Sequence, residues 1–239
     1  MGRIKRYRTA WSRHHRSKGH GIHSPFAFNF VRFVLREKSP YYCYDELKQL
    51  RQAVIESLRG AKKHRRVISF KGVKMIFRIT NFFNPLRCFQ VGTCYGITAA
   101  SVMSVSSSSK MWLYEPQLDA FPVVAQVLMP YLDRIDFYNE LDIAIGDYLR
   151  SLDEGEQPFV LINSVPDSRD FEALCRFLTA LLERDSVIVL RNLDHSDLMK
   201  SMWIGLKDSM TRGQSFTNEK TAVIVSRRKL NLEHFFLWF

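Results

Sequence analysis

Two glycines and one glutamate stand where the first two apolar segments of the α/β part of the chain end. Gly92 and Gly96 follow the segment 87–91, and Glu115 closes the segment 111–115. A glycine turn between a strand and a helix lets the backbone pass close to a ligand and directs free N–H groups at it. A carboxylate at the end of the next strand can accept hydrogen bonds from both hydroxyls of a ribose. The spacing therefore predicts a nucleotide-type site, and the alternatives are a turn that serves only packing and a solvated strand-end acid.

Short apolar strands alternate with helices from about residue 86 onward, and these elements must position that site. The expected strands are 87–91, 111–115, 135–138, 159–162, 187–190, 221–226 and 233–239. Helices are expected after Gly96, from Pro116, after Asp167 and over 198–206. This alternation predicts a mostly parallel sheet covered on both faces, and the last two strands predict an antiparallel closing hairpin. Ligands bind such sheets at the carboxyl ends of the strands.

Positive charge is concentrated in the first third of the 239 residues. The net charge is +11; residues 1–78 hold 20 Lys/Arg against 4 Asp/Glu, and residues 79–239 hold 15 against 20. We interpret residues 1–23 as a basic arm, 24–66 as a helical extension with helices from Ser24 and over 45–59, and 67–239 as the α/β domain. A basic leader predicts a polyanion such as nucleic acid as a partner of residues 1–66, with a solvated tail as the alternative.

Several classes of protein and site are disfavoured by the sequence. No segment approaches the roughly 18 apolar residues of a membrane-spanning helix, and the charged start lacks the apolar core of a secretory signal. The four cysteines show no CxxC spacing, so we expect reduced thiols and a cytoplasmic protein. The histidines of the leader lie among Arg and Lys without nearby Cys or carboxylates, which argues against a metal site there.

Four short motifs carry a resemblance to a known family. They are HGIHSPF at 20–26, VGTCYGIT at 91–98, GDYL at 146–149 and the segment from Ser196 to Trp203. The chain resembles a family of S-adenosylmethionine-dependent methyltransferase-like proteins from Bacteroidetes, and the resemblance covers nearly the whole chain. The first motif is specific to that family, whereas the glycine turn is shared by many class I methyltransferases.

The resemblance implies a fold, a cofactor and a set of cofactor-binding residues. The implied fold is the seven-stranded, Rossmann-like class I methyltransferase sheet, and the implied cofactor is S-adenosylmethionine. Its adenine is expected near Gly146-Asp147 and its ribose on Glu115. The residues implied to bind it are Gln90, Gly92, Thr93, Gly96, Glu115, Asp147 and Asn163. The implied activity is methyl transfer to an unidentified acceptor.

The chain departs from the family at three strand ends that usually carry acids. Gln90, Asn163 and the pair Arg191-Asn192 stand at these positions. Carboxylates there would be candidates for binding a metal or for general base catalysis. Their replacement predicts no metal site and leaves the catalytic residue unassigned. The alternative function is a catalytically degenerate relative that binds nucleic acid or another polyanion.

Overall fold

Eight strands form one sheet in the computed structural model, which describes residues 13–15, 17–59, 67–117, 121–165 and 167–239. The strands are β1 (Arg87–Val91), β2 (Lys110–Tyr114), β3 (Ile135–Tyr138), β4 (Phe159–Ile162), β5 (Ser186–Arg191), β6 (Gln214–Thr217), β7 (Thr221–Ser226) and β8 (Glu233–Phe236). Their order in the sheet is β3-β2-β1-β4-β5-β7-β6-β8. Strand β7 pairs antiparallel with β5 and β6, and the other pairings are parallel. The expected mostly parallel α/β sheet is confirmed.

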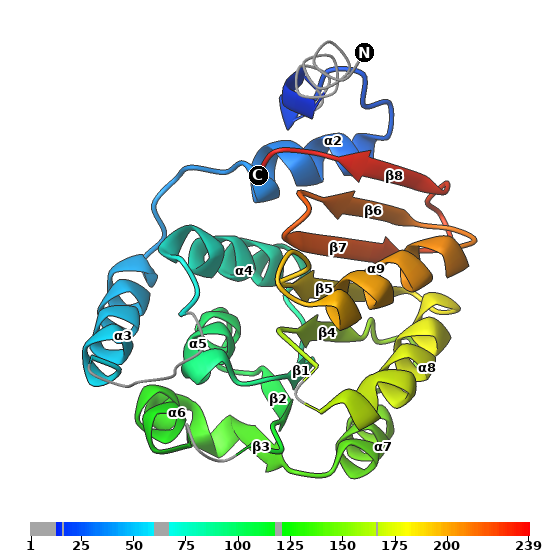
Figure 1. Ribbon diagram of the computed structural model, residues 1–239. Helices are drawn as coiled ribbons and strands as arrows, with labels where there is room; N and C mark the ends of the chain where they lie inside the picture. The colour runs from blue at the N-terminus through cyan, green and yellow to red at the C-terminus, as the bar shows by residue number, and fades with distance from the viewer. Residues whose placement is uncertain (1–12, 16, 60–66, 118–120, 166) are drawn as a thin grey trace.

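Helices cover both faces of the sheet (Figure 1). In chain order they are α2 (Pro25–Phe30), η1 (Val31–Leu35), α3 (Tyr44–Ser57), α4 (Phe70–Phe83), η2 (Cys94–Gly96), α5 (Ile97–Met103), α6 (Phe121–Leu128), η3 (Met129–Arg134), α7 (Leu141–Ser151), η4 (Ser168–Asp170), α8 (Phe171–Leu182) and α9 (Asp197–Ser209). One apolar core lies under α2 to α6, and a second lies under α7, α8 and α9. The helices of the expected extension, α2, η1 and α3, thus pack into the same core as α4 and α5.

Local sequence explains why several of these elements begin and pack where they do. Ser24 caps α2 by accepting a hydrogen bond from the Ala27 N–H at 3.3 Å, and Pro25 occupies the first turn. Strands β4 and β5 are buried along their whole length, as expected for apolar strands that are covered on both faces. The two strands lie side by side in the middle of the sheet. Their carboxyl ends therefore meet at one edge.

The end of the sheet differs from the expectation in two ways. The sheet has eight strands rather than seven, and 221–226 and 233–239 do not form its antiparallel hairpin. The hairpin joins β6 to β7 through the turn at Asn218, whose side-chain oxygen accepts hydrogen bonds from the N–H groups of Lys220 and Thr221. Strand β6 was not expected because it is short and begins with Gln214 and Ser215, which are polar but buried. Strand β8 pairs parallel with β6 and forms the eighth strand.

Three helices also differ from the sequence-based expectations. Helix α4 was not expected, although Ser69 caps it by accepting from the Gly72 N–H at 3.2 Å. Helix α7 was not expected either, because its sequence was assigned to a motif before β4. The helix after β2 begins at Phe121 rather than Pro116. Proline is tolerated in the first turn of a helix, but a proline alone does not show that a helix begins there. The predicted start of this helix was therefore too early.

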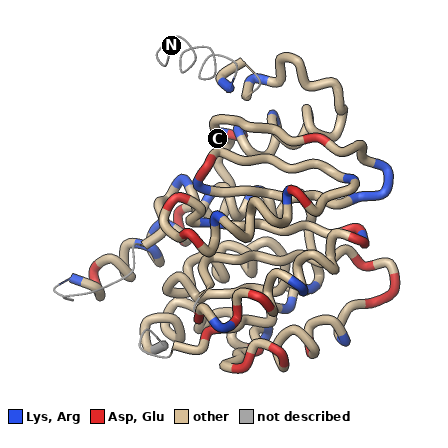
Figure 2. The backbone as a smooth tube through the Cα atoms, turned by 45° about the vertical axis from the view of Figure 1, so that its right-hand side comes forward, with Lys and Arg blue, Asp and Glu red and all other residues tan. Residues whose placement is uncertain are grey.

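The described part of the expected basic arm contacts the other end of the chain. The guanidinium carbon of Arg13 lies 3.4 Å from the ring centroid of Phe236, and the Trp238 N–H donates to Ser17 Oγ at 2.6 Å. Residues 1–12 and the basic connector 62–66 lie outside the described residues. Over the described body, basic and acidic residues are interspersed (Figure 2). Among the described helices, none is long and apolar enough to cross a membrane.

Candidate functional site

The carboxyl ends of β1 and β4 are adjacent and mark the point where the strand order reverses. Successive strands step from β1 toward β3 on one side and from β4 toward β5 on the other. Open α/β sheets bind ligands at this kind of switch point. Gly92 follows β1 here, and Asn163 follows β4. The Asn163 N–H donates to Val91 O at 2.9 Å, which holds the two strand ends together.

The turn after β1 has an unusual backbone. Gly92 and Gly96 both have φ of +79°, and the intervening Cys94 and Tyr95 also have positive φ, at 48° and 57°. A Cβ atom on Gly92 would lie 2.7 Å from Ser164 Oγ, so the backbone after β1 approaches the segment after β4 closely. Left-handed non-glycine residues are costly and gather at functional sites. The turn therefore has the features of a ligand-binding loop.

Glu115 lies against this turn rather than in solvent. Its side chain follows β2 and is buried, with 9% of its surface exposed. Glu115 Oε2 accepts hydrogen bonds from the Thr93 N–H at 3.0 Å and from Thr93 Oγ1 at 3.1 Å. Glu115 Oε1 accepts from the Gln117 N–H at 3.3 Å. A carboxylate can accept about four hydrogen bonds, two on each oxygen, so Oε1 retains capacity for a ligand beside the turn. The alternative of a solvated strand-end acid is wrong.

Two amide side chains stabilise the turn from beneath. Gln90 Nε2 and Asn163 Nδ2 both donate to Gly92 O, at 3.0 and 2.8 Å, and both donate to Thr98 Oγ1, at 3.1 and 2.9 Å. Gln90 Oε1 is buried and has no hydrogen-bond partner among the described residues. Buried polar atoms are nearly always paired, and this amide oxygen is one of several exceptions among the described residues. Gln90, Gly92, Thr93, Gly96, Glu115 and Asn163 thus form one connected group.

The end of β5 is tied to the same group. Arg191 is 7% exposed, and its Nη1 donates to Asn163 Oδ1 at 2.6 Å and to Cys94 Sγ at 3.6 Å. Asn192 Nδ2 donates to Asn163 O at 2.8 Å. Across the described residues, no group of three or more His, Cys, Asp or Glu side chains gathers as a set of metal ligands. An arginine therefore organises the strand ends from β5, where the family resemblance implies acids.

Asp147 is not part of this group. It lies in the second half of α7, where its carboxylate accepts from the Tyr138 hydroxyl at 2.9 Å and pairs with Arg150. Burial, followed by the hydrogen bond to Asp147, raises the pKa of Tyr138 to about 12. The residues that directly follow β3 at the carboxyl edge of the sheet are Asn139 and Glu140, both exposed. The hydrogen bond to Tyr138 places Asp147 next to the last residue of β3, and its position beside an adenine ring stays a prediction.

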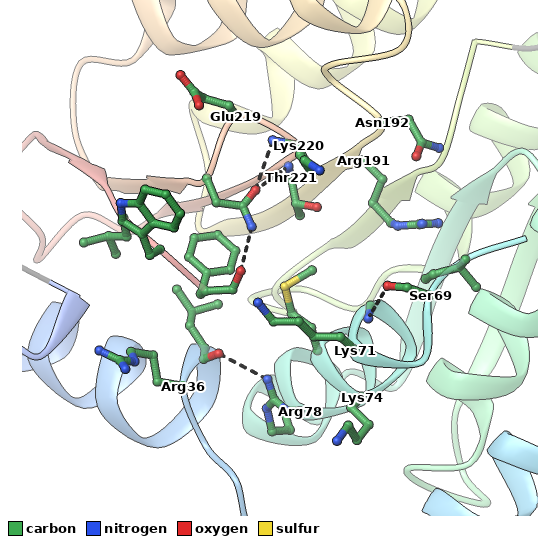
Figure 3. A pocket seen from close by; sticks show the side chains of 18 of the residues that line it. Arg36, Ser69, Lys71, Lys74, Arg78, Arg191, Asn192, Glu219, Lys220 and Thr221 are labelled. Carbon is green, nitrogen blue, oxygen red and sulfur yellow. Dashed lines mark hydrogen bonds between the residues drawn. The ribbon is translucent and has the colours of Figure 1, made fainter. Parts of the chain in front are cut away.

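A cavity of about 840 Å³ opens beside the group, between α4 and the ends of β5, β6 and β8. Figure 3 shows side chains that line it. Among the described residues, eight lysines and arginines line it, against three acidic side chains. This cavity was not expected from the sequence, because α4 was not predicted. A signal was present: Lys71, Lys74 and Arg78 follow helical spacing and form one basic face.

The chain is similar to solved structures at low sequence identity. No protein-family model and no curated protein matches it. A Bacillus cereus O-methyltransferase in complex with SAH (S-adenosylhomocysteine) is 13% identical, with a TM-score of 0.53 over 81% of this chain and 94% of that one. The SAH-bound Podospora anserina methyltransferase PaMTH1 is 10% identical, with a TM-score of 0.55 over 95% and 97%. The Streptomyces achromogenes O-methyltransferase TomG in complex with SAM (S-adenosylmethionine) is 14% identical, with a TM-score of 0.52 over 82% and 95%.

These similarities extend over most of each chain, while the identities are low. The parallel sheet, its antiparallel β7 and the glycine turn after β1 agree with the fold expected from the motifs. The chain has the Rossmann-like fold of class I methyltransferases.

Proposed function

We propose that the protein binds S-adenosylmethionine at the Gly92–Gly96 turn and transfers its methyl group to an acceptor. The observation that carries the proposal is the buried Glu115 carboxylate, which accepts two hydrogen bonds from Thr93 of the turn. An acid held there can accept hydrogen bonds from ribose hydroxyls. The fold supports the same cofactor, because similar structures include proteins in complex with SAM or SAH.

The residues of the site would each have a defined role toward this cofactor. Gly92 and Gly96 leave space for Ser164 and Val127, which lie against the turn, and Thr93 orients Glu115. Gln90 and Asn163 hold Gly92 O from below, so the turn keeps its shape when the ligand leaves. When bound, S-adenosylmethionine supplies a methyl group that passes to a nucleophile as the carbon–sulfur bond breaks and its electron pair stays on sulfur. Positioning the nucleophile in line is the main requirement that falls on the protein.

Titration calorimetry with S-adenosylhomocysteine tests this proposal. We expect the parent protein to bind, and we expect Glu115→Gln to lose about 1.5–3 kcal/mol, the range for a hydrogen bond to a charged group, or about 10- to 150-fold in affinity. The glutamine keeps the shape of the side chain and an oxygen that can accept from Thr93. Thermal unfolding of both proteins checks that the fold is retained.

The matched control is Glu172→Gln, which removes an equal charge from an exposed position on α8. This variant should bind like the parent. Absence of binding by the parent would refute the proposed cofactor. Equal affinity of the parent and Glu115→Gln would refute the role of Glu115.

A further inference from the structure

The cavity beside the glycine turn contains buried positive charge that is not neutralised by an acidic side chain of the described residues. Arg78 and Arg191 both line it, and each is 7% exposed. Arg78 donates to the carbonyl oxygens of Val34 and Leu35, at 2.7 and 3.1 Å, and Arg191 donates to Asn163 Oδ1. Neither guanidinium forms an ion pair with a carboxylate in the part of the chain that the structure describes. Buried charges are ordinarily paired, so we expect an anion from outside the chain to bind near these two guanidinium groups.

The three acidic side chains that line the cavity are already engaged. Glu219 pairs with Arg13 at 3.3 Å, and Asp194 lies 3.8 Å from Lys220 Nζ. The carboxylate of Glu37 accepts from the N–H groups of Lys38 and Ser39, both at 2.6 Å. The acids of the cavity therefore leave its two buried arginines without an ion-pair partner.

Lys71 adds a third positive charge that has no partner of opposite sign. It extends from the first turn of α4 into the cavity (Figure 3) and makes no ion pair or hydrogen bond with the described residues. Lys71 is exposed, and the partial desolvation that it still experiences lowers its pKa. The positive charges of Arg78, Arg36 and Lys220 lower it further. This crowding of like charge costs free energy that a bound anion would offset.

We propose that this cavity binds the methyl acceptor, a small molecule that carries an oxyanion group, phosphate or carboxylate, next to the atom to be methylated. That the ligand is the methyl acceptor rests on the proposed function. That the ligand carries an anionic group rests on the cavity alone. Guanidinium groups bind phosphate and carboxylate through paired hydrogen bonds. The Nε and Nη2 groups of Arg191 make no hydrogen bond with the described residues, so they remain available as donors.

The position of the cavity suits an acceptor. Arg191 lines the cavity and donates to Asn163, which in turn donates to Gly92 O. A ligand on Arg191 is thus one side chain away from the glycine turn. The volume of about 840 Å³ lies within the usual range for small-molecule sites.

Calorimetry with pyrophosphate, citrate and glycerol tests the proposal, using protein saturated with S-adenosylhomocysteine and, in parallel, protein without it. We expect one or both anions to bind. Binding of pyrophosphate would indicate a phosphate site, and binding of citrate a carboxylate site. We expect no binding of glycerol, which is uncharged. Lys71→Gln should weaken anion binding about tenfold, and Lys71→Arg should retain it. Lys48→Gln, an equal loss of charge at an exposed position on α3, should stay within about twofold of the parent.

Three results would overturn the proposal. The first is normal binding of S-adenosylhomocysteine with no binding of either anion, which would leave the proposed function intact. The second is equal weakening by Lys71→Gln and Lys48→Gln, which would mean general attraction to a basic protein. The third is tight binding of a short RNA duplex that pyrophosphate displaces, which would favour a polyanion rather than a small molecule as the ligand of the cavity. Anion binding without any binding of S-adenosylhomocysteine would retain the cavity and refute the cofactor instead.

Discussion

At the scale of single residues, the glycine turn requires both backbone freedom and space. Gly92 and Gly155 share a φ of +79°, yet a Cβ atom on Gly92 would meet Ser164 Oγ at 2.7 Å, and one on Gly155 would meet nothing within 4 Å. The two positions therefore separate the cost of left-handed backbone from the cost of close approach. Gly155 lies in the exposed turn between α7 and β4, away from the site.

We predict that Gly155→Ala lowers the free energy of unfolding by about 1–2 kcal/mol, the cost of a left-handed L-residue. Gly92→Ala should lower it by roughly 1 kcal/mol more, which is the low end for overpacking because a serine hydroxyl can rotate away. Urea unfolding monitored by circular dichroism measures both changes. Equal losses in the two variants would show that the approach of Ser164 to Gly92 carries no cost.

At the scale of elements, Arg78 joins α4 to η1 through the carbonyl oxygens at the end of η1. These bonds fix the helical segment before the cavity against the helix that lines it. We predict that Arg78→Met lowers the free energy of unfolding by about 1–3 kcal/mol, because methionine fills the space but leaves two buried carbonyl oxygens without donors. Urea unfolding measures the size of this loss of stability. Faster hydrogen exchange at the Arg36 amide, which donates to Val31 O, would show that the loss is located at the end of η1.

Arg32→Met is the control for this change, because Arg32 is an exposed residue of η1. Surface substitutions of this kind usually stay within about 0.5 kcal/mol. If Arg32→Met destabilises the protein as much as Arg78→Met does, the contact between α4 and η1 is not the cause.

At the scale of the whole molecule, we predict that cofactor binding and any methyl transfer do not depend on a divalent metal. Mg²⁺ binds through oxygen ligands that usually include one or two carboxylates. Asn163, Arg191 and Asn192 stand at the strand ends in question, and the Arg191 guanidinium would repel a cation beside Asn163 Oδ1. Affinity for S-adenosylhomocysteine should therefore be the same, within about twofold, with and without EDTA. Loss of affinity or of transfer in EDTA, restored by Mg²⁺, would contradict this expectation.

The sequence by itself determined the features that depend on short-range pattern. The apolar segments 87–91, 135–138 and 159–162 became β1, β3 and β4 with the expected bounds. The expectation that Gly92 and Glu115 belong together needed only the rule that parallel strands end at one edge. The polar strand ends at Asn163 and Arg191 were also visible in the sequence, because each directly follows or closes a buried strand.

Only the tertiary structure decided how distant segments pair. Strand β6 is short and starts with polar residues whose burial depends on β7 and β8, so its own pattern does not indicate a strand. Asp147 fitted a sequence motif, but its place is set by the packing of α7 against the sheet. The cavity joins α4 to the ends of β5, β6 and β8, which are more than one hundred residues away in the chain. Long-range packing alone brings Arg78 and Arg191 to one cavity, because a local sequence pattern does not determine which distant residues lie close together.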